Sequence, residues 1–209
     1  MKILIACEES QTVCKAFRKL GYEAYSCDIL PCSGGHPEWH IQGDVLLELK
    51  KDWDMIIAHP PCTYLSNAGI RWFNEERYGE KAIERKRLRL EAMDFVIKIA
   101  NNKCPKIVIE NPRGWLNSHW RKPDQTVQPW MFGEEFNKPT CLWLKGVSKL
   151  IPTNIVGKGE MVSHITKKGK IKTDSKWYYE AFSMPPAERQ RFRSKTFQGI
   201  ADAMAEQWG

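Results

Sequence analysis

The chain has 209 residues, of which 42% are hydrophobic and 27% are charged, which is typical of one soluble globular domain. Its formal net charge of +7 suits a polyanionic partner but does not identify one. Only about five apolar residues precede an acidic turn, and no apolar run reaches the roughly 18 residues of a membrane helix, so neither a secretory signal nor a membrane span is expected.

Strand and helix patterns alternate along the chain. Residues 2–7 form a short β-rich run, and Ser10 is placed to cap a helix over 11–20 that stops at Gly21. Further strands are expected over 22–29, 54–59, 106–111 and 140–146, and helical segments over 43–51, 80–102 and 198–208. Apolar strands separated by helices predict an α/β fold with a mostly parallel sheet and helices on both faces.

One domain over 1–209 is expected. Its least core-like part lies within 147–186, which we interpret as a small recognition or lid insertion. The seven cysteines include no C-x-x-C pair, which predicts a reducing, cytoplasmic location.

Four residues within fourteen positions could coordinate zinc: Cys27, Cys32, His36 and His40. Their spacing matches no common zinc finger, and Pro37 disturbs the turn between the two histidines. We therefore expect a loop with unligated side chains and no metal.

Polar and reactive side chains follow the predicted strands. In a parallel sheet, ligands bind at the carboxyl ends of the strands. The residues at these ends are Cys7, Glu8, Glu9 and Ser10, then Asp28, Asp44, the stretch His59–Pro60–Pro61–Cys62, and finally Glu110 and Asn111. Asp28 stands where an acidic residue usually accepts ribose hydroxyls, and Asp44 is placed to accept from an adenine amino group. A thiol, carboxylates and stiff prolines therefore gather at one edge.

The stretch HPPCTYLS, followed far along by VIENPRG, resembles the cytosine-C5 DNA methyltransferase family, in a compact phage or bacterial form. In that family a Pro-Cys turn follows the fourth strand and a Glu-Asn pair the fifth, here Pro61–Cys62 and Glu110–Asn111. Ser66 matches a family serine, the Gly43–Asp44 pair and Asp28 resemble two cofactor motifs, and FQGIADAMAEQW resembles the last motif. The resemblance covers most of the chain in order.

This resemblance implies a Rossmann-like fold and methyl transfer from S-adenosylmethionine to C5 of a cytosine flipped out of DNA. Cys62 would add to C6 as a thiolate, and Glu110 would hydrogen-bond the base and deliver a proton, for which burial would raise its pKa. The implied catalytic residues are Cys62, Glu110 and Asn111. The implied cofactor-binding residues are Cys7, Glu8, Glu9, Ser10, Asp28, Ile29, Asp44, Val45, Pro60, Gln198 and Gly199. The implied DNA-binding residues are Ser66, Arg71, Arg113, Lys138, Thr140, Arg191, Arg193 and Lys195.

The sequence departs from the family in three places. The first loop, ACEESQTV, has no glycine, Lys138 and Thr140 replace an arginine-rich segment, and only 147–186 is available for target recognition. Two alternatives remain: a catalytically silent DNA-binding protein on this scaffold, and an amino-group methyltransferase acting on adenine N6 or cytosine N4. For the latter, HPPC carries cysteine where an aromatic ring is typical, and Glu110–Asn111 has no role.

Three basic clusters complete the sequence. The cluster of Arg85, Lys86, Arg87 and Arg89 is expected to be a solvated helix face. The other two are Arg189–Lys195 and the lysines preceding Trp177, Tyr178 and Tyr179. Basic stripes with aromatics suit phosphate contacts and base stacking, so these two are expected to contact DNA.

Overall fold

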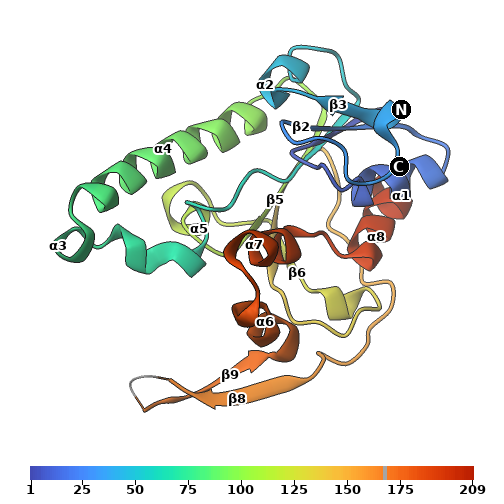
Figure 1. Ribbon diagram of the computed structural model, residues 1–209. Coiled ribbons are helices and arrows are strands. Elements are labelled where there is room, and N and C mark those ends of the chain that lie inside the picture. The colour runs from blue at the N-terminus through green and yellow to red at the C-terminus, as the bar shows by residue number, and fades with distance from the viewer. Residues whose placement is uncertain (167–168) are drawn as a thin grey trace.

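The computed structural model describes residues 1–166 and 169–209, apart from the side chains of residues 186, 187, 190 and 191. A seven-stranded sheet forms the centre, in the order β3-β2-β1-β4-β5-β7-β6 (Figure 1). Its strands are β1 (Lys2–Ala6), β2 (Glu23–Asp28), β3 (His40–Gln42), β4 (Met55–Ala58), β5 (Lys106–Pro112), β6 (Gln125–Val127) and β7 (Thr140–Lys145). The first five strands pair in parallel, and β7 runs antiparallel to both of its neighbours. The expected α/β fold with a mostly parallel sheet is confirmed.

Helices cover both faces of the sheet, as expected. On one face α1 (Thr12–Lys19) packs against α8 (Gln198–Trp208), and Figure 1 shows these two helices side by side. On the other face lies α4 (Glu80–Ala100). Alternate residues of β1 separate accordingly, because Ile3 and Ile5 join the α1–α8 core and Leu4 joins the α4 core.

The remaining helical elements are short. They are α2 (Val45–Glu48), α3 (Glu75–Tyr78), α5 (Leu116–His119), α6 (Lys176–Glu180) and α7 (Pro186–Ser194), with the 3-10 turns η1 (Pro37–Trp39), η2 (Asn67–Phe73), η3 (Pro129–Met131) and η4 (Ala181–Ser183). Among the described residues, no helix combines the length and the apolar composition that a membrane crossing requires.

The strand order reverses direction beside β1. From β1 the chain adds β2 and then β3 on one side, and β4 returns to pair with the other side of β1. In open α/β sheets, ligands bind in the crevice at such a switch point, beyond the carboxyl ends of the strands. Here that place lies beyond Ala6 and Ala58, where the sequence stretches ACEESQ and HPPC begin.

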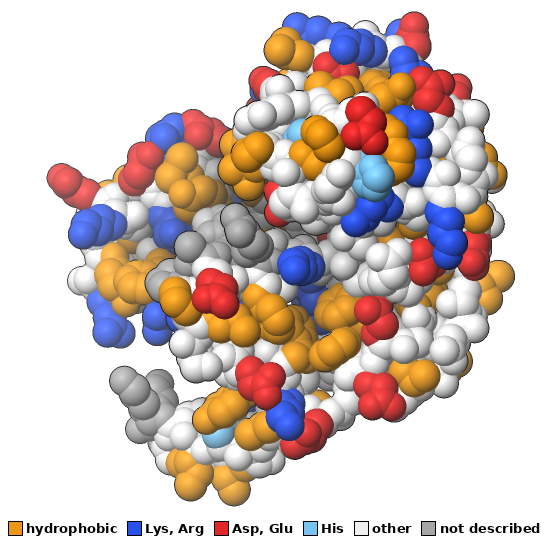
Figure 2. Space-filling model, turned by 45° about the vertical axis from the view of Figure 1, so that its right-hand side comes forward, with side chains coloured by type: hydrophobic (Ala, Val, Ile, Leu, Met, Phe, Trp, Pro, Cys, Tyr) orange, Lys and Arg blue, Asp and Glu red, His pale blue; other side chains and the backbone are white. Residues whose placement is uncertain are grey.

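The expected insertion over 147–186 contains a separate antiparallel hairpin of β8 (Met161–Ile165) and β9 (Ile171–Ser175), followed by α6 and η4. The hairpin extends away from the central sheet (Figure 1). Trp177, in α6, is buried against Phe136 and Phe197. This contact anchors the insertion to the rest of the domain. Figure 2 shows hydrophobic side chains on the exposed side of the hairpin, in keeping with the exposure of Ile165 and Ile171.

Candidate functional site

The segment after β4 forms a tight turn around Cys62. The backbone carbonyl of Cys62 accepts hydrogen bonds from the amides of Leu65, at 3.1 Å, and Ser66, at 2.9 Å. Pro60 and Pro61 restrict the approach to this turn and supply no amide donors. Asn111, at the end of β5, donates from Nδ2 to the carbonyl of Pro60 at 2.7 Å and is fully buried. Asn111 therefore fixes the ends of β4 and β5 to each other.

A second backbone contact fixes the far side of the same turn. The amide of Trp115 donates to the carbonyl of Leu65 at 2.7 Å, and Ser66 pairs with Gly114 in an isolated bridge. A Cβ atom at Gly114 would overlap the Leu65 carbonyl oxygen, so only glycine fits there. Gly114, the glycine of VIENPRG, thus allows the loop after β5 to touch the loop after β4. The bridge to Gly114 fixes the main chain of Ser66.

Two arginines of α4 also hold this turn, although a solvated face was expected for them. The Arg85 guanidinium donates to the carbonyl of Thr63, and Arg89 Nε donates to the carbonyl of Tyr64 at 3.0 Å. Arg89 is buried, with its guanidinium over the rings of Phe73 and Trp115. The solvated-face prediction is wrong for these two, because i, i+4 spacing puts them on the face that meets the segment after Cys62. It holds for Lys86 and Arg87, which are exposed and pair with glutamates.

We expect Arg89→Ala to lower the free energy of unfolding by about 2–4 kcal/mol, since it leaves a cavity and deprives the part-buried Tyr64 carbonyl of its partner. Arg87→Ala on the same helix is the matched control and should change stability little, because Arg87 is exposed and bonds only to exposed glutamates. Urea unfolding of both variants measures the difference. Equal effects would show that Arg89 does not hold the Cys62 turn.

A buried imidazole–carboxylate pair lies next to the turn. Glu110 Oε2 is 2.9 Å from His59 Nδ1, and the two side chains are only 14% and 10% exposed. Burial alone would raise the pKa of Glu110, but the hydrogen bond and charge of His59, with the charge of Lys138, hold it below its ordinary value. The expectation that burial raises this pKa is therefore wrong, because a cation stands beside the carboxylate.

The Cys62 thiol is partly buried, and burial followed by the charge of Glu110 raises its pKa. Lys138 and Arg193 act in the opposite direction. Lys138 is itself largely enclosed, donates from Nζ to the carbonyl of Lys195 at 2.9 Å, and has its pKa lowered by burial. Thiol, carboxylate and two cations, from four separate stretches of sequence, therefore act on one another at the carboxyl edge of the sheet.

The glycine-free loop between β1 and α1 adopts a conformation that glycine usually provides. Cys7 and Gln11 have φ angles of 60° and 59°, in the left-handed region. The amides of Cys7 and Glu8 both donate to the carbonyl of Cys27, which holds the loop against β2. Such backbone strain in a non-glycine loop is typical of functional sites.

Glu8, and not Ser10, caps α1. The buried Glu8 carboxylate accepts from the amides of Val13, at 2.7 Å, and Cys14, at 3.2 Å. The Ser10 hydroxyl instead meets the hydroxyl of Thr12 at 3.3 Å, so the predicted serine cap is wrong. A carboxyl group of the chain itself thus occupies the helix end where phosphate-binding loops of this architecture hold their ligand.

Burial raises the pKa of Glu8 above its ordinary value, against the effects of His59 and the two amides. The stability that Glu8 contributes is therefore complete below the ordinary glutamate pKa and is lost as pH rises through the raised value. We expect the difference in free energy of unfolding, wild type minus Glu8→Gln, to fall as pH increases from about 4 to about 8. Urea unfolding across this range tests the sign, and a difference that grows with pH would contradict it.

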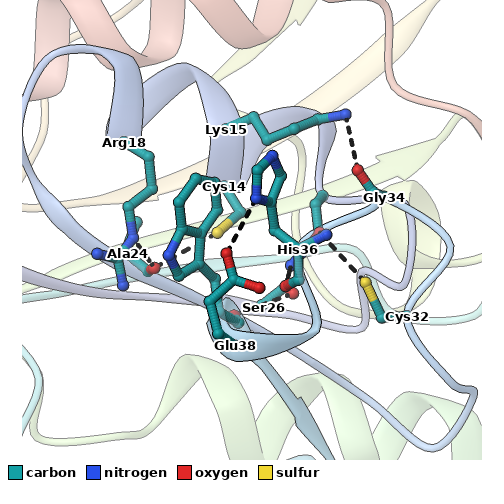
Figure 3. A network of polar contacts seen from close by, with 11 residues as sticks. Cys14, Lys15, Arg18, Ala24, Ser26, Cys32, Gly34, His36 and Glu38 are labelled. Carbon is teal, nitrogen blue, oxygen red and sulfur yellow. Dashed lines mark hydrogen bonds and ion pairs between the residues drawn. The ribbon is translucent and has the colours of Figure 1, made fainter.

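Gln11 joins this loop to the segment between β2 and β3. Its buried side chain donates from Nε2 to the carbonyl of His36 at 2.8 Å and accepts, at Oε1, from the His36 amide and the Cys32 thiol. Gly34 lies so close that a Cβ atom there would overlap Gln11, and Lys15 Nζ donates to the Gly34 carbonyl. Figure 3 shows Cys32, Gly34 and His36 on the loop that folds over this end of α1.

The four candidate zinc ligands are bonded elsewhere. His36 contacts Glu38 and stacks on Trp39, while both ring nitrogens of His40 have partners, the Ser26 hydroxyl and the Leu30 carbonyl. The Cys27 thiol points to the carbonyl of Gly43. In residues 1–166 and 169–209, no three His, Cys, Asp or Glu side chains converge as a metal site.

The acidic residues at the ends of β2 and β3 lie near each other. Asp28 is half-buried and accepts from the Leu30 amide at 2.9 Å, and burial raises its pKa. Asp44 caps α2 through the Leu46 amide, and the charges of Asp28 and Asp44 both act on Cys7. Ile29 is 74% exposed beside them. This corner presents two carboxylates and an apolar side chain at the switch point.

Several predicted cofactor residues serve the fold. Val45 is buried in the core below α2. Gln198 donates to Asp202, and the amide of Gly199 donates to Glu134 Oε2 at 3.0 Å. A Cβ atom at Gly199 would overlap the carbonyl of Phe132, so this glycine allows α8 to pack closely. Glu9 acts through its carbonyl, which accepts from the amide of Ser33.

The predicted DNA-binding residues are divided between surface and interior. Arg71, Arg113 and Lys195 are exposed, with Arg71 over the ring of Trp72. Thr140 is buried and donates to the Lys138 carbonyl, so it offers no surface contact, contrary to expectation. The side chain of Arg191 lies outside the described residues. On the face in Figure 2, basic and acidic side chains are interspersed.

Sequence reasoning missed His59, Arg85, Arg89 and Gln11 as parts of this site. The available signal for His59 is its position directly after a buried apolar strand. No protein-family model matches the sequence, and no curated protein is significantly similar to it.

Proposed function

We propose that the protein methylates C5 of cytosine in DNA, using S-adenosylmethionine and a covalent adduct through Cys62. One observation carries the proposal. The Cys62 thiol and the buried Glu110 carboxylate, from the ends of the adjacent strands β4 and β5, lie close enough for the carboxylate charge to raise the thiol pKa. A thiol beside a buried carboxylate that is hydrogen-bonded to an imidazole combines a nucleophile with a proton-carrying pair, as addition to a pyrimidine ring requires.

The chemistry divides between the two groups. The Cys62 sulfur bonds to C6, the C5–C6 double bond is lost, and charge that develops at ring N3 is neutralised by a proton from the Glu110 side. C5 then carries enamine character and attacks the methyl group. The bound cofactor supplies an electrophilic methyl. Removal of the C5 proton and elimination of the thiolate restore the ring. Because the thiol pKa is raised, Lys138 and Arg193 have the task of stabilising the thiolate as it forms.

The loop around Glu8 supports a cofactor without phosphate. The Val13 and Cys14 amides at the start of α1 are already bonded to the Glu8 carboxylate, so they are not free to bind a pyrophosphate. Nearby, Asp28 and Asp44 present carboxylates for ribose hydroxyls and an amino group, with Ile29 as an apolar contact. S-adenosylmethionine carries ribose hydroxyls and an adenine amino group, together with a cationic sulfonium and no phosphate.

Exposed basic residues around the turn support a DNA partner. Arg71 follows the Cys62 turn in sequence, and Arg113 precedes Gly114, which pairs with Ser66 of that turn. Lys195 lies on the segment whose carbonyl binds Lys138. A base within a duplex is inaccessible, so the proposal includes flipping of the target cytosine. The β8–β9 hairpin is then the element available to contact flanking DNA.

The test is incubation with methyl-labelled S-adenosylmethionine and unmodified DNA, followed by nucleoside analysis. The matched control is a duplex in which 5-methylcytosine replaces every cytosine. Label in 5-methyldeoxycytidine from the first duplex alone supports the proposal. Label on an amino group would indicate the adenine N6 or cytosine N4 alternative. DNA binding without transfer would indicate a catalytically silent protein, and no cofactor binding would overturn the proposal.

A further inference from the structure

His59 lies between the buried strand β4 and the Pro-Pro-Cys turn, and its side chain points into the site. Its amide donates to the carbonyl of Ala6 at 2.9 Å, which continues the pairing of β4 with β1. Its Nδ1 is 2.9 Å from Glu110 Oε2, and the ring is nine-tenths buried. The two residues are joined across the carboxyl ends of neighbouring strands, so their geometry is set by the sheet.

Three charged side chains face this imidazole from different elements. Glu110 comes from β5, Glu8 from the end of β1, and Lys138 from the segment before β7. Among the described residues, His59 Nε2 is buried and has no hydrogen-bond partner. A buried imidazole with two carboxylates around it and one occupied ring nitrogen is arranged to keep a proton, not to pack as an apolar ring.

We propose that His59 is a positioning residue that keeps one proton available to Glu110, so that the pair protonates ring N3 as Cys62 adds to the base. This inference rests on the function proposed above and assigns a role to a residue that the family resemblance leaves without one.

The proton balance includes one net release, because the C5 proton leaves to water. The thiol proton of Cys62 leaves as its sulfur bonds to C6. The pair transfers a proton to N3, from His59 Nδ1 through the Glu110 carboxyl group, as the C5–C6 electrons shift into the ring. The thiol proton replaces it on the pair. On elimination, the C5 proton passes to water, the C6–S electrons return to sulfur, and the N3 proton returns through the pair to the Cys62 thiolate. The thiol and the pair are thereby restored, and no oxidant or reductant is needed.

The titration of His59 tests the pair without any assay of activity. Burial lowers the pKa of His59, but the hydrogen bond and charge of Glu110, with the charge of Glu8, outweigh burial and raise it above the ordinary imidazole value. The chain has five histidines, so their ring protons can be followed by NMR and His59 identified by its loss in His59→Gln. We expect His59 to titrate above about 6.5. We expect it to titrate below that value in Glu110→Gln, where burial remains without the carboxylate. An ordinary or lowered pKa in the wild type would overturn the inference.

Single-turnover methyl transfer tests the catalytic consequence. The wild-type rate should fall at alkaline pH as the pair loses its proton. The His59→Gln rate should be lower by about 10²-fold and should not show this alkaline fall. A merely structural histidine would lower the rate without changing the pH profile, and that result overturns the inference alone. A wild type inactive at every pH overturns the proposed function, and with it this catalytic role, while the NMR titration still reports whether the pair exists.

Discussion

We expect Cys62→Ser to abolish the proposed methyl transfer, with a fall in the single-turnover rate on the order of 10⁴-fold or more. The hydroxyl of serine is far less acidic than a thiol and is a weaker nucleophile. Cofactor binding should remain, because Cys62 is not among the residues proposed to hold the cofactor. The loss of methyl transfer would therefore reflect the chemical step and not cofactor binding.

The matched control is Cys104→Ser. Cys104 lies before the amino end of β5, and its thiol donates to the carbonyls of Trp53 and Lys106, which a serine hydroxyl can also do. Its activity should be close to that of the wild type. DNA that contains 5-fluorocytosine should trap a covalent complex with wild type and Cys104→Ser but not with Cys62→Ser. A trapped complex in Cys62→Ser would show that another residue is the nucleophile.

Glu110→Gln has the second large effect, a fall in rate of about 10²–10⁴-fold with cofactor binding unchanged. The amide keeps the shape of the side chain but cannot carry a proton to the base. It also leaves His59 buried without its carboxylate, which favours the neutral imidazole. Rates at saturating cofactor and DNA measure the effect, and an Asp52→Asn variant serves as control because Asp52 is exposed and pairs only with Lys103. A Glu110→Gln variant as fast as the wild type would remove the carboxylate from the mechanism.

Much of this architecture could be predicted from local sequence. The strands β1, β4 and β5 are apolar on both faces, and parallel pairing places their last residues at one edge regardless of the loops between them. The positions of Cys62 and Glu110 follow directly, since Cys62 stands just beyond β4 and Glu110 lies near the carboxyl end of β5. The C-terminal helix was predicted with its observed bounds, because its small and apolar residues leave no competing pattern.

What the sequence did not predict depends on contacts between distant segments. The strands β3 and β6 have three residues each and little apolar pattern of their own. The antiparallel direction of β7 depends on how the chain returns after β6. Likewise, the burial of Arg89 and the capping of α1 by Glu8 arise from neighbours brought together only in the folded chain. The cation that lowers the pKa of Glu110 stands 51 residues earlier in sequence.

The left-handed conformations of Cys7 and Gln11 have a thermodynamic consequence for ligand capture. A glycine-rich loop samples many shapes and must lose that freedom when it closes on a ligand. Here the same shape is imposed beforehand by the Glu8 carboxylate and by the Gln11 side chain, at a cost already paid during folding. Binding of the proposed cofactor would therefore require little ordering of the β1–α1 loop. Selection among ligands would depend on how well each one fits the rigid surface of that loop.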